Sequence, residues 1–162
     1  MKSSYIYFWS RFLKYCTQNE SIFRDLAVPK GAFMSKTSNK VRVDLCAYKS
    51  SKLCDSPVRV EVYFTGRTKE DHNKDFDFFF QYRVDIEKEL GFGLVWELEN
   101  PKVKSRKIYC TNPLLEVGKN DELIFDFFDS IETRLLQVFG KYRHGFLRNF
   151  QRHKNLLMQA IL

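Results

Sequence analysis

The chain has 162 residues, of which 44% are hydrophobic and 16% aromatic, and its formal net charge is +7 at pH 7. One domain fits this length, and the many large apolar side chains exclude an intrinsically disordered chain, because they suffice for a hydrophobic core. No apolar run is long enough to span a membrane, and the early apolar run is interrupted by Arg11 and Lys14, which argues against a secretory signal. We therefore expect a cytoplasmic protein.

The first half of the chain predicts one helix and three strands. Apolar and aromatic residues recur at helical spacing over 5–16, which indicates an amphipathic helix. A short strand is expected over 32–37. The stretches 40–48 and 58–64 alternate apolar residues with polar, mostly charged ones, as strands with one buried face do, and 50–57 between them is typical of a loop.

The second half predicts two helices, a strand pair and a basic tail. The hydrophobic period returns to that of a helix over 69–90, directly before a glycine suited to end it. The stretches 92–98 and 105–110 indicate two strands joined by a turn. An asparagine N-cap followed by two acidic residues begins a helix that we expect to end at Gly140, and 143–162 suggests one more amphipathic helix.

The order of these elements predicts the fold. Helix, strand meander, helix, hairpin, helix and tail helix favour an α+β fold, with a mainly antiparallel sheet of about five strands packed against amphipathic helices. We expect residues 1–142 to form one α+β domain. Residues 143–162 should form a basic amphipathic helix that packs on this domain or is presented to a partner.

The tail is the first candidate site. From Lys141 onward there are five Lys or Arg residues and no Asp or Glu, so most of the net charge lies there. Such cations can neutralise phosphates along nucleic acid, which makes affinity fall with salt. The nucleic-acid-binding candidates in the tail are Lys141, Arg143, Arg148, Arg152 and Lys154.

The other face of the tail is apolar. Phe146, Phe150 and Leu157 recur at helical spacing, and the two aromatic rings could stack on unpaired bases. The same three side chains would equally anchor the helix on a protein partner. The tail alone leaves both interpretations open.

A charged face of the sheet is the second candidate site. If the two clearer strands bury their aliphatic residues, the opposite face carries the residues Arg42, Asp44, Arg59, Glu61 and Tyr63, with Arg106 as a further candidate. Arg42, Arg59 and Arg106 are weaker candidates for contacting nucleic acid. Whether this face is exposed or covered is open at this point.

Asp44 and Glu61 are similar to the acidic pair with which restriction-type nucleases hold Mg²⁺ beside the scissile phosphate. Such nucleases usually carry a lysine two residues after the second acid, where Tyr63 stands here. The alternative is pairing of arginines with acids on a structural face, worth about 1 kcal/mol or less per pair. We favour pairing over catalysis.

The cysteines and histidines predict no metal site. The four cysteines contain no Cys-x-x-Cys pair, and Cys16, Cys46 and Cys110 fall within apolar patterns, as reduced, buried cysteines do. His72 and His144 have no carboxylate or cysteine partners at ligand spacing, and neither does the third histidine. No cofactor is expected, except Mg²⁺ if the protein is a nuclease.

Several short stretches occur in a recognisable order between residues 5 and 142. They are Phe8-Trp9-Ser10-Arg11-Phe12-Leu13, Val58-Arg59-Val60-Glu61-Val62-Tyr63-Phe64, Ile86-Glu87-Lys88-Glu89-Leu90-Gly91, Val95-Trp96-Glu97, Ser105-Arg106 and the amphipathic helix before Lys141. Together they resemble the bacterial and archaeal family called domain of unknown function 4268. Lys107 stands where members usually place an aliphatic residue.

The resemblance implies an association with DNA-directed or defence systems, because members of this family occur alone or behind nuclease-like domains. It carries over no catalytic residues. We therefore expect a non-catalytic binding module that contacts nucleic acid, or a nucleic-acid-processing or defence complex, through the basic tail. A protein-interaction module or inhibitor that uses the last helix is the first alternative, and an Mg²⁺-dependent nuclease is the second. No membrane partner is expected.

Overall fold

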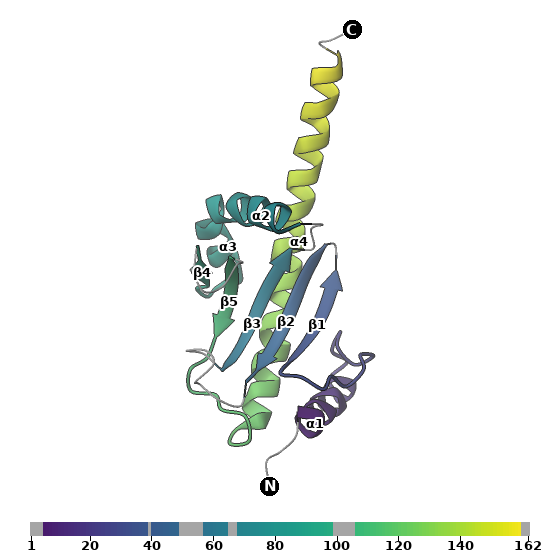
Figure 1. Cartoon of the computed structure of the whole chain (residues 1–162), viewed down its shortest axis with the longest axis vertical. Coiled ribbons are helices and arrows are strands. Elements are labelled where there is room, and N and C mark those ends of the chain that lie inside the picture. The colour runs from purple at the N-terminus through teal and green to yellow at the C-terminus, as the bar shows by residue number, and fades with distance from the viewer. Residues whose placement is uncertain (1–4, 39, 49–56, 65–67, 99–105, 160–162) are drawn as a thin grey trace.

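The computed structural model describes residues 5–38, 40–48, 57–64, 68–98 and 106–159, with Lys69 and residues 146–159 described by their backbone alone. Its elements in chain order are α1 (Tyr5–Gln18), β1 (Phe33–Ser38), β2 (Val41–Ala47), β3 (Val58–Phe64), α2 (Lys69–Gln81), α3 (Arg83–Leu90), β4 (Val95–Glu97), β5 (Lys107–Thr111) and α4 (Asp121–Gln159). The strands form one five-stranded antiparallel sheet in the order β1-β2-β3-β5-β4 (Figure 1). The predicted α+β fold with a mainly antiparallel sheet is confirmed.

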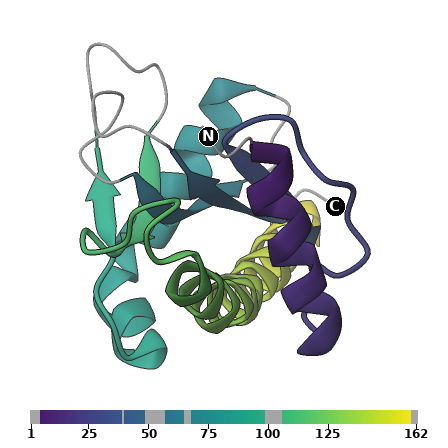
Figure 2. The same cartoon turned by 90° about the horizontal axis from the view of Figure 1, so that it is seen from below.

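A helical layer covers one face of the sheet. Helix α4 runs behind the strands in Figure 1 and lies beneath the sheet in Figure 2. Helix α1 packs against the first half of α4, where the ring centroids of Phe8 and Phe125 are 5.3 Å apart and those of Trp9 and Phe128 are 6.0 Å apart. Aromatic side chains therefore join α1 and the first half of α4 in one core.

Strand alternation decides which side chains enter this core. The aliphatic side chains of β2 and β3 are almost completely buried: Val41, Val43, Leu45, Val58, Val60 and Val62. Helix α4 supplies the residues Ile124, Phe125, Phe128, Leu135 and Phe139 to the same cluster. Because successive side chains of a strand point to opposite faces, the charged residues of β2 and β3 lie on the other face.

The helix predicted over 69–90 is two helices. Helix α2 ends at Gln81, and the next residue, Tyr82, caps it: its backbone (φ −101°, ψ 12°) departs from helical values, and its N–H donates to the carbonyl of Phe79 at 3.0 Å. Helix α3 then starts in a new direction and ends at Gly91, which has the left-handed conformation (φ 78°) that glycine adopts without strain. The prediction that this helical stretch ends at Gly91 was correct, and the prediction of one continuous helix was wrong.

The prediction that a helix ends at Gly140 is also wrong. Helix α4 passes through Gly140 and Gly145 and continues to Gln159. A glycine inside a helix costs about 1 kcal/mol relative to alanine. Here the turn is held by tertiary contacts, since Phe139 before it and Arg143 after it are both buried.

Among the described helices, none combines the length and hydropathy that crossing a bilayer requires.

Candidate functional site

The strand register brings the predicted charged residues together. Asp44 of β2 lies directly opposite Glu61 of β3, and Arg42 lies opposite Tyr63. Asp44 and Glu61 are 6% and 7% exposed, and Arg59 is similarly buried, so the face is covered at its centre. Two like charges directly opposite each other destabilise a sheet unless they are compensated. Asp44 and Glu61 therefore need nearby cations that compensate their charges.

Each acid is compensated by an arginine of its own strand. The Nη2 atom of Arg42 donates to Oδ2 of Asp44 at 2.8 Å, and Nη2 of Arg59 forms an ion pair with Oε1 of Glu61 at 2.5 Å. The Nζ atom of Lys107 on β5 lies 3.6 Å from the same Glu61 oxygen. Three cations and two anions thus form a charged network of two neighbouring sets, Arg42–Asp44 and Arg59–Glu61–Lys107, with a combined formal charge of +1.

Aromatic rings cover the two guanidinium groups. The guanidinium of Arg42 lies 4.7 Å from the ring centroid of Tyr63, and that of Arg59 lies 5.1 Å from the ring centroid of Tyr109. Cation–π contacts of this kind stabilise a desolvated cation. The rings therefore help to hold the charged network in place.

This geometry fits internal pairing better than a magnesium site. Lys107 could take the part of the nuclease lysine, in whose sequence position Tyr63 stands. However, Asp44 and Glu61 both contact arginines already, and the net charge of the network is positive. A divalent cation would have to displace these contacts against that charge. Within the described residues, no group of three or more His, Cys, Asp and Glu side chains is arranged to hold a metal ion.

Arg106 does not join this face. It lies just before β5, where its guanidinium forms an ion pair with Asp77 of α2 and lies 5.5 Å from the ring centroid of Phe76. Residue 107, and not 106, shares a face with Tyr109, because side chains alternate along the strand. The expectation for Arg106 is therefore corrected, and Lys107 takes the place that we had considered for it.

Two of the five tail cations hold the domain together. Arg143 is 8% exposed, and its Nη1 atom lies 2.7 Å from Oδ2 of Asp75 on α2. Lys141 is exposed, and its Nζ atom lies 2.8 Å from both carboxylate oxygens of Glu89 on α3. The prediction that Arg143 is available to nucleic acid is corrected, because its side chain is inside the fold.

The remaining tail candidates lie on a helix that leaves the domain. Figure 1 shows the last turns of α4, in yellow, extending past the sheet with no other described element beside them. We call residues 146–159 the projecting segment. It contains the basic residues Arg148, Arg152 and Lys154 and the apolar residues Phe146, Phe150 and Leu157, whose side chains lie outside the described part.

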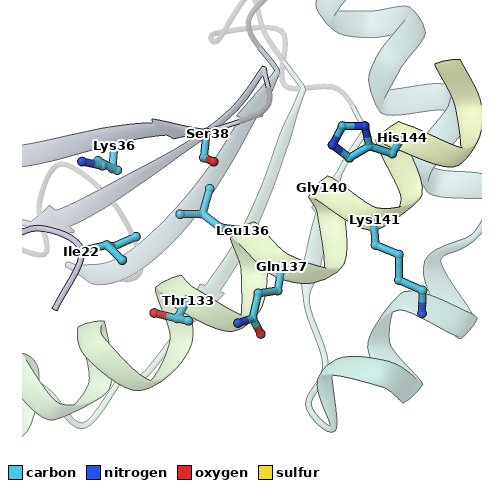
Figure 3. Close-up of a pocket in the computed structure, with 9 residues that line it drawn as sticks. All are labelled: Ile22, Lys36, Ser38, Thr133, Leu136, Gln137, Gly140, Lys141 and His144. Atoms are coloured by element: carbon cyan, nitrogen blue, oxygen red, sulfur yellow. The ribbon is translucent and has the colours of Figure 1, made fainter. Parts of the chain in front are cut away.

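Sequence reasoning missed a groove between β1 and α4. Its volume is about 480 Å³, and the two residues that line it from β1, Lys36 and Ser38, alternate along the strand. From α4 it is lined by residues of one helical face, Thr133, Leu136, Gln137, Gly140, Lys141 and His144, and Ile22 completes the lining. Figure 3 shows Leu136 pointing from α4 toward the strands, whereas Lys141 extends away from them. No local sequence motif predicts this groove, because two elements that are far apart in the chain form it together.

A buried acid also escaped sequence reasoning. Glu132 of α4 is completely buried, and its Oε1 atom accepts a hydrogen bond of 3.2 Å from the hydroxyl of Ser21. Burial raises the pKa of Glu132 to about 8, with a smaller contribution from Asp129, and the Ser21 hydrogen bond and the charge of Lys36 oppose this rise. Glu132 is therefore mostly protonated at neutral pH.

Comparison with known proteins gives one match. A family described as domain of unknown function, DUF4268, matches residues 4–143. No curated protein and no solved structure matches the chain. The match covers the domain and ends where the projecting segment is about to begin.

Proposed function

The chain belongs to the DUF4268 family of domains of unknown function, and from this premise we propose that it is a protein-interaction module that presents the projecting segment to a partner. The observation that carries this proposal is the path of α4, which leaves the sheet and continues as helix to Gln159 (Figure 1). The proposal includes a reducing, cytoplasmic setting, because the buried Cys16, Cys46 and Cys110 are free thiols.

The apolar positions of the projecting segment continue the buried stripe of α4. Phe139 is buried in the domain, and Phe146, Phe150 and Leu157 follow it at intervals of seven, four and seven residues. These intervals keep all four positions on one side of a helix. Burying a side chain of this size contributes roughly 1.5–3 kcal/mol. A partner that covers this stripe therefore gains a set of strong anchors.

The basic residues define the partner's chemistry. Arg148, Arg152 and Lys154 occur without any acid in the segment, so two copies paired through this helix would place like charges together. An apolar groove with an acidic rim suits the segment better, because it covers the apolar stripe and compensates the cations. The proposed partner is therefore a different protein with such a groove.

Nucleic acid is the second candidate partner. It is supported by the same three cations, with the weaker Arg42 and Arg59 of the sheet face. However, Lys141 and Arg143 form ion pairs with Glu89 and Asp75, and a contact made by charge alone would leave the apolar stripe in water. These two points rank a protein partner above nucleic acid.

Two matched triple variants test this proposal. Phe146→Ala/Phe150→Ala/Leu157→Ala removes the anchors, and Arg148→Gln/Arg152→Gln/Lys154→Gln removes the charges, while both keep good helix formers. We expect capture of specific protein partners from the source cells to fall at least tenfold with the first variant and less with the second. Labelled DNA and RNA, measured over a salt series, provide the comparison. Salt-sensitive nucleic-acid binding that is lost only with the charge variant would contradict the proposal.

A further inference from the structure

The outer edge of β1 offers backbone groups beside the groove. β1 lies at the edge of the sheet that the described strands form, with β2 beside it (Figure 1). The N–H of Ala47 donates to the carbonyl of Ala32 at 2.8 Å, and Phe33 lies opposite Cys46, which fixes the phase of the β1–β2 ladder. Bonded positions alternate in an antiparallel pair, so the N–H and C=O groups of Ser35 and Thr37 point away from β2.

The groove beside this edge is cationic. Lys36 forms no ion pair with any residue that the structure describes, and Lys141 extends away from the strands toward Glu89 (Figure 3). None of the described residues that line the groove is acidic. The nearby Glu132 compensates Lys36 little at neutral pH, because its pKa is raised to about 8. An occupant that carries a carboxylate is therefore favoured.

The shape of the groove suits an extended segment. The helical wall from Thr133 to His144 is about 16 Å long at 1.5 Å per residue, which matches roughly five residues of extended chain at 3.3 Å each. A strand laid along β1 would direct alternate side chains toward α4, where Ile22 and Leu136 supply apolar contacts. An edge strand flanked by a helix is an arrangement that allows a peptide to bind by adding a strand.

We propose that the groove between β1 and α4 binds an extended, acidic peptide segment of another protein, which pairs with the backbone of Ser35 and Thr37 as a sixth strand. Lys36 makes the site selective, because a lysine on the inner side of an edge strand opposes pairing with an apolar strand and accepts one that brings a carboxylate. The projecting segment of this chain is basic and so is disfavoured as the occupant. This inference does not rest on the proposed function, since it concerns a different surface.

The test uses a random heptapeptide display library selected on the full chain. We expect enrichment of peptides with Asp or Glu among alternating apolar residues. The affinity of an enriched peptide, measured by fluorescence anisotropy, should fall at least tenfold with Lys36→Glu and be lost with Thr37→Pro. The proline removes an N–H that points away from β2, so the β1–β2 ladder keeps its hydrogen bonds.

Two matched variants control for indirect effects. Lys14→Glu makes the same change of charge on the exposed side of α1, and Thr37→Val changes the same side chain but keeps the N–H; both should bind the peptide like the wild type. The proposal is overturned if no peptide is enriched, or if the enriched peptides bind the Thr37→Pro variant as well as they bind the wild type.

Discussion

Replacing Glu61 with alanine is expected to lower the free energy of unfolding by about 3 kcal/mol. Glu61 is 7% exposed, and its carboxylate lies 2.5 Å from Arg59 and 3.6 Å from Lys107. Its loss leaves two cations in a desolvated region without the anion that they share, which costs more than the pair contributes when intact. Urea unfolding monitored by circular dichroism measures the change.

A triple variant separates charge from packing in this experiment. Glu61→Leu/Arg59→Met/Lys107→Met removes the charges together, so we expect it to be more stable than Glu61→Ala. The nuclease interpretation predicts the opposite pattern for Glu61→Ala, because removing an acid that exists for catalysis usually costs activity and not stability. Unchanged stability, together with loss of Mg²⁺-dependent cleavage of DNA or RNA, would contradict the structural role of this network.

The second large effect is the dependence of stability on pH through Glu132. Its pKa is raised to about 8 in the folded chain and is near 4.5 ordinarily, so between these values the folded state binds a proton that the unfolded state has released. Stability therefore falls by about 1.4 kcal/mol per pH unit over this interval, and no further above it. Glu132→Gln removes this loss and should keep the hydrogen bond from Ser21. We expect the variant to be more stable than the wild type by several kcal/mol at pH 8 and nearly equal near pH 4.5.

Unfolding curves of both proteins from pH 4.5 to pH 9 test this difference. The groups that act on Glu132 are Ser21, Asp129, Lys36 and Thr133, and none of them is changed by the substitution. Glu70→Gln removes an exposed carboxylate and serves as the control for losing one acidic side chain. A difference between Glu132→Gln and the wild type that stays constant with pH would show that Glu132 is not protonated in the folded chain.

Strands were the most predictable part of the fold. The alternation over 58–64 matches β3 to the residue, and 40–48 differs from β2 by one residue at each end. Alternation is reliable here because one face of these strands packs on α4 and the other is charged, so the polarity of each side chain indicates the face on which it lies. The strand expected over 92–98 is the three-residue β4, because a short edge strand leaves a weaker pattern.

Helix boundaries were harder to predict where tertiary contacts decide them. Gly91 and Gly140 both follow an apolar helical pattern, and only Gly91 ends its helix. The difference is that residues beyond Gly140 still pack, with Arg143 reaching Asp75 of α2. A contact between residues so far apart in the chain leaves no local signal.

The same limit applies to the candidate sites. The sequence located the charged sheet face, because its register follows from alternation, but it could not show that Asp44 and Glu61 are each compensated by an arginine. All five tail cations looked equivalent in sequence. The ion pairs that distinguish Lys141 and Arg143 depend on Glu89 and Asp75, which only the fold brings near.

We propose that the projecting segment is presented to a partner and does not stabilise the domain. Thermal unfolding of a chain that ends at Gly145, compared with the full chain, tests this claim most directly. We predict that the two melting temperatures agree within about 2 °C, because the ion pairs of Lys141 and Arg143 remain in the shorter chain. A fall of about 6 °C or more, equivalent to roughly 2 kcal/mol, would show that the segment packs on its own domain and would contradict the account.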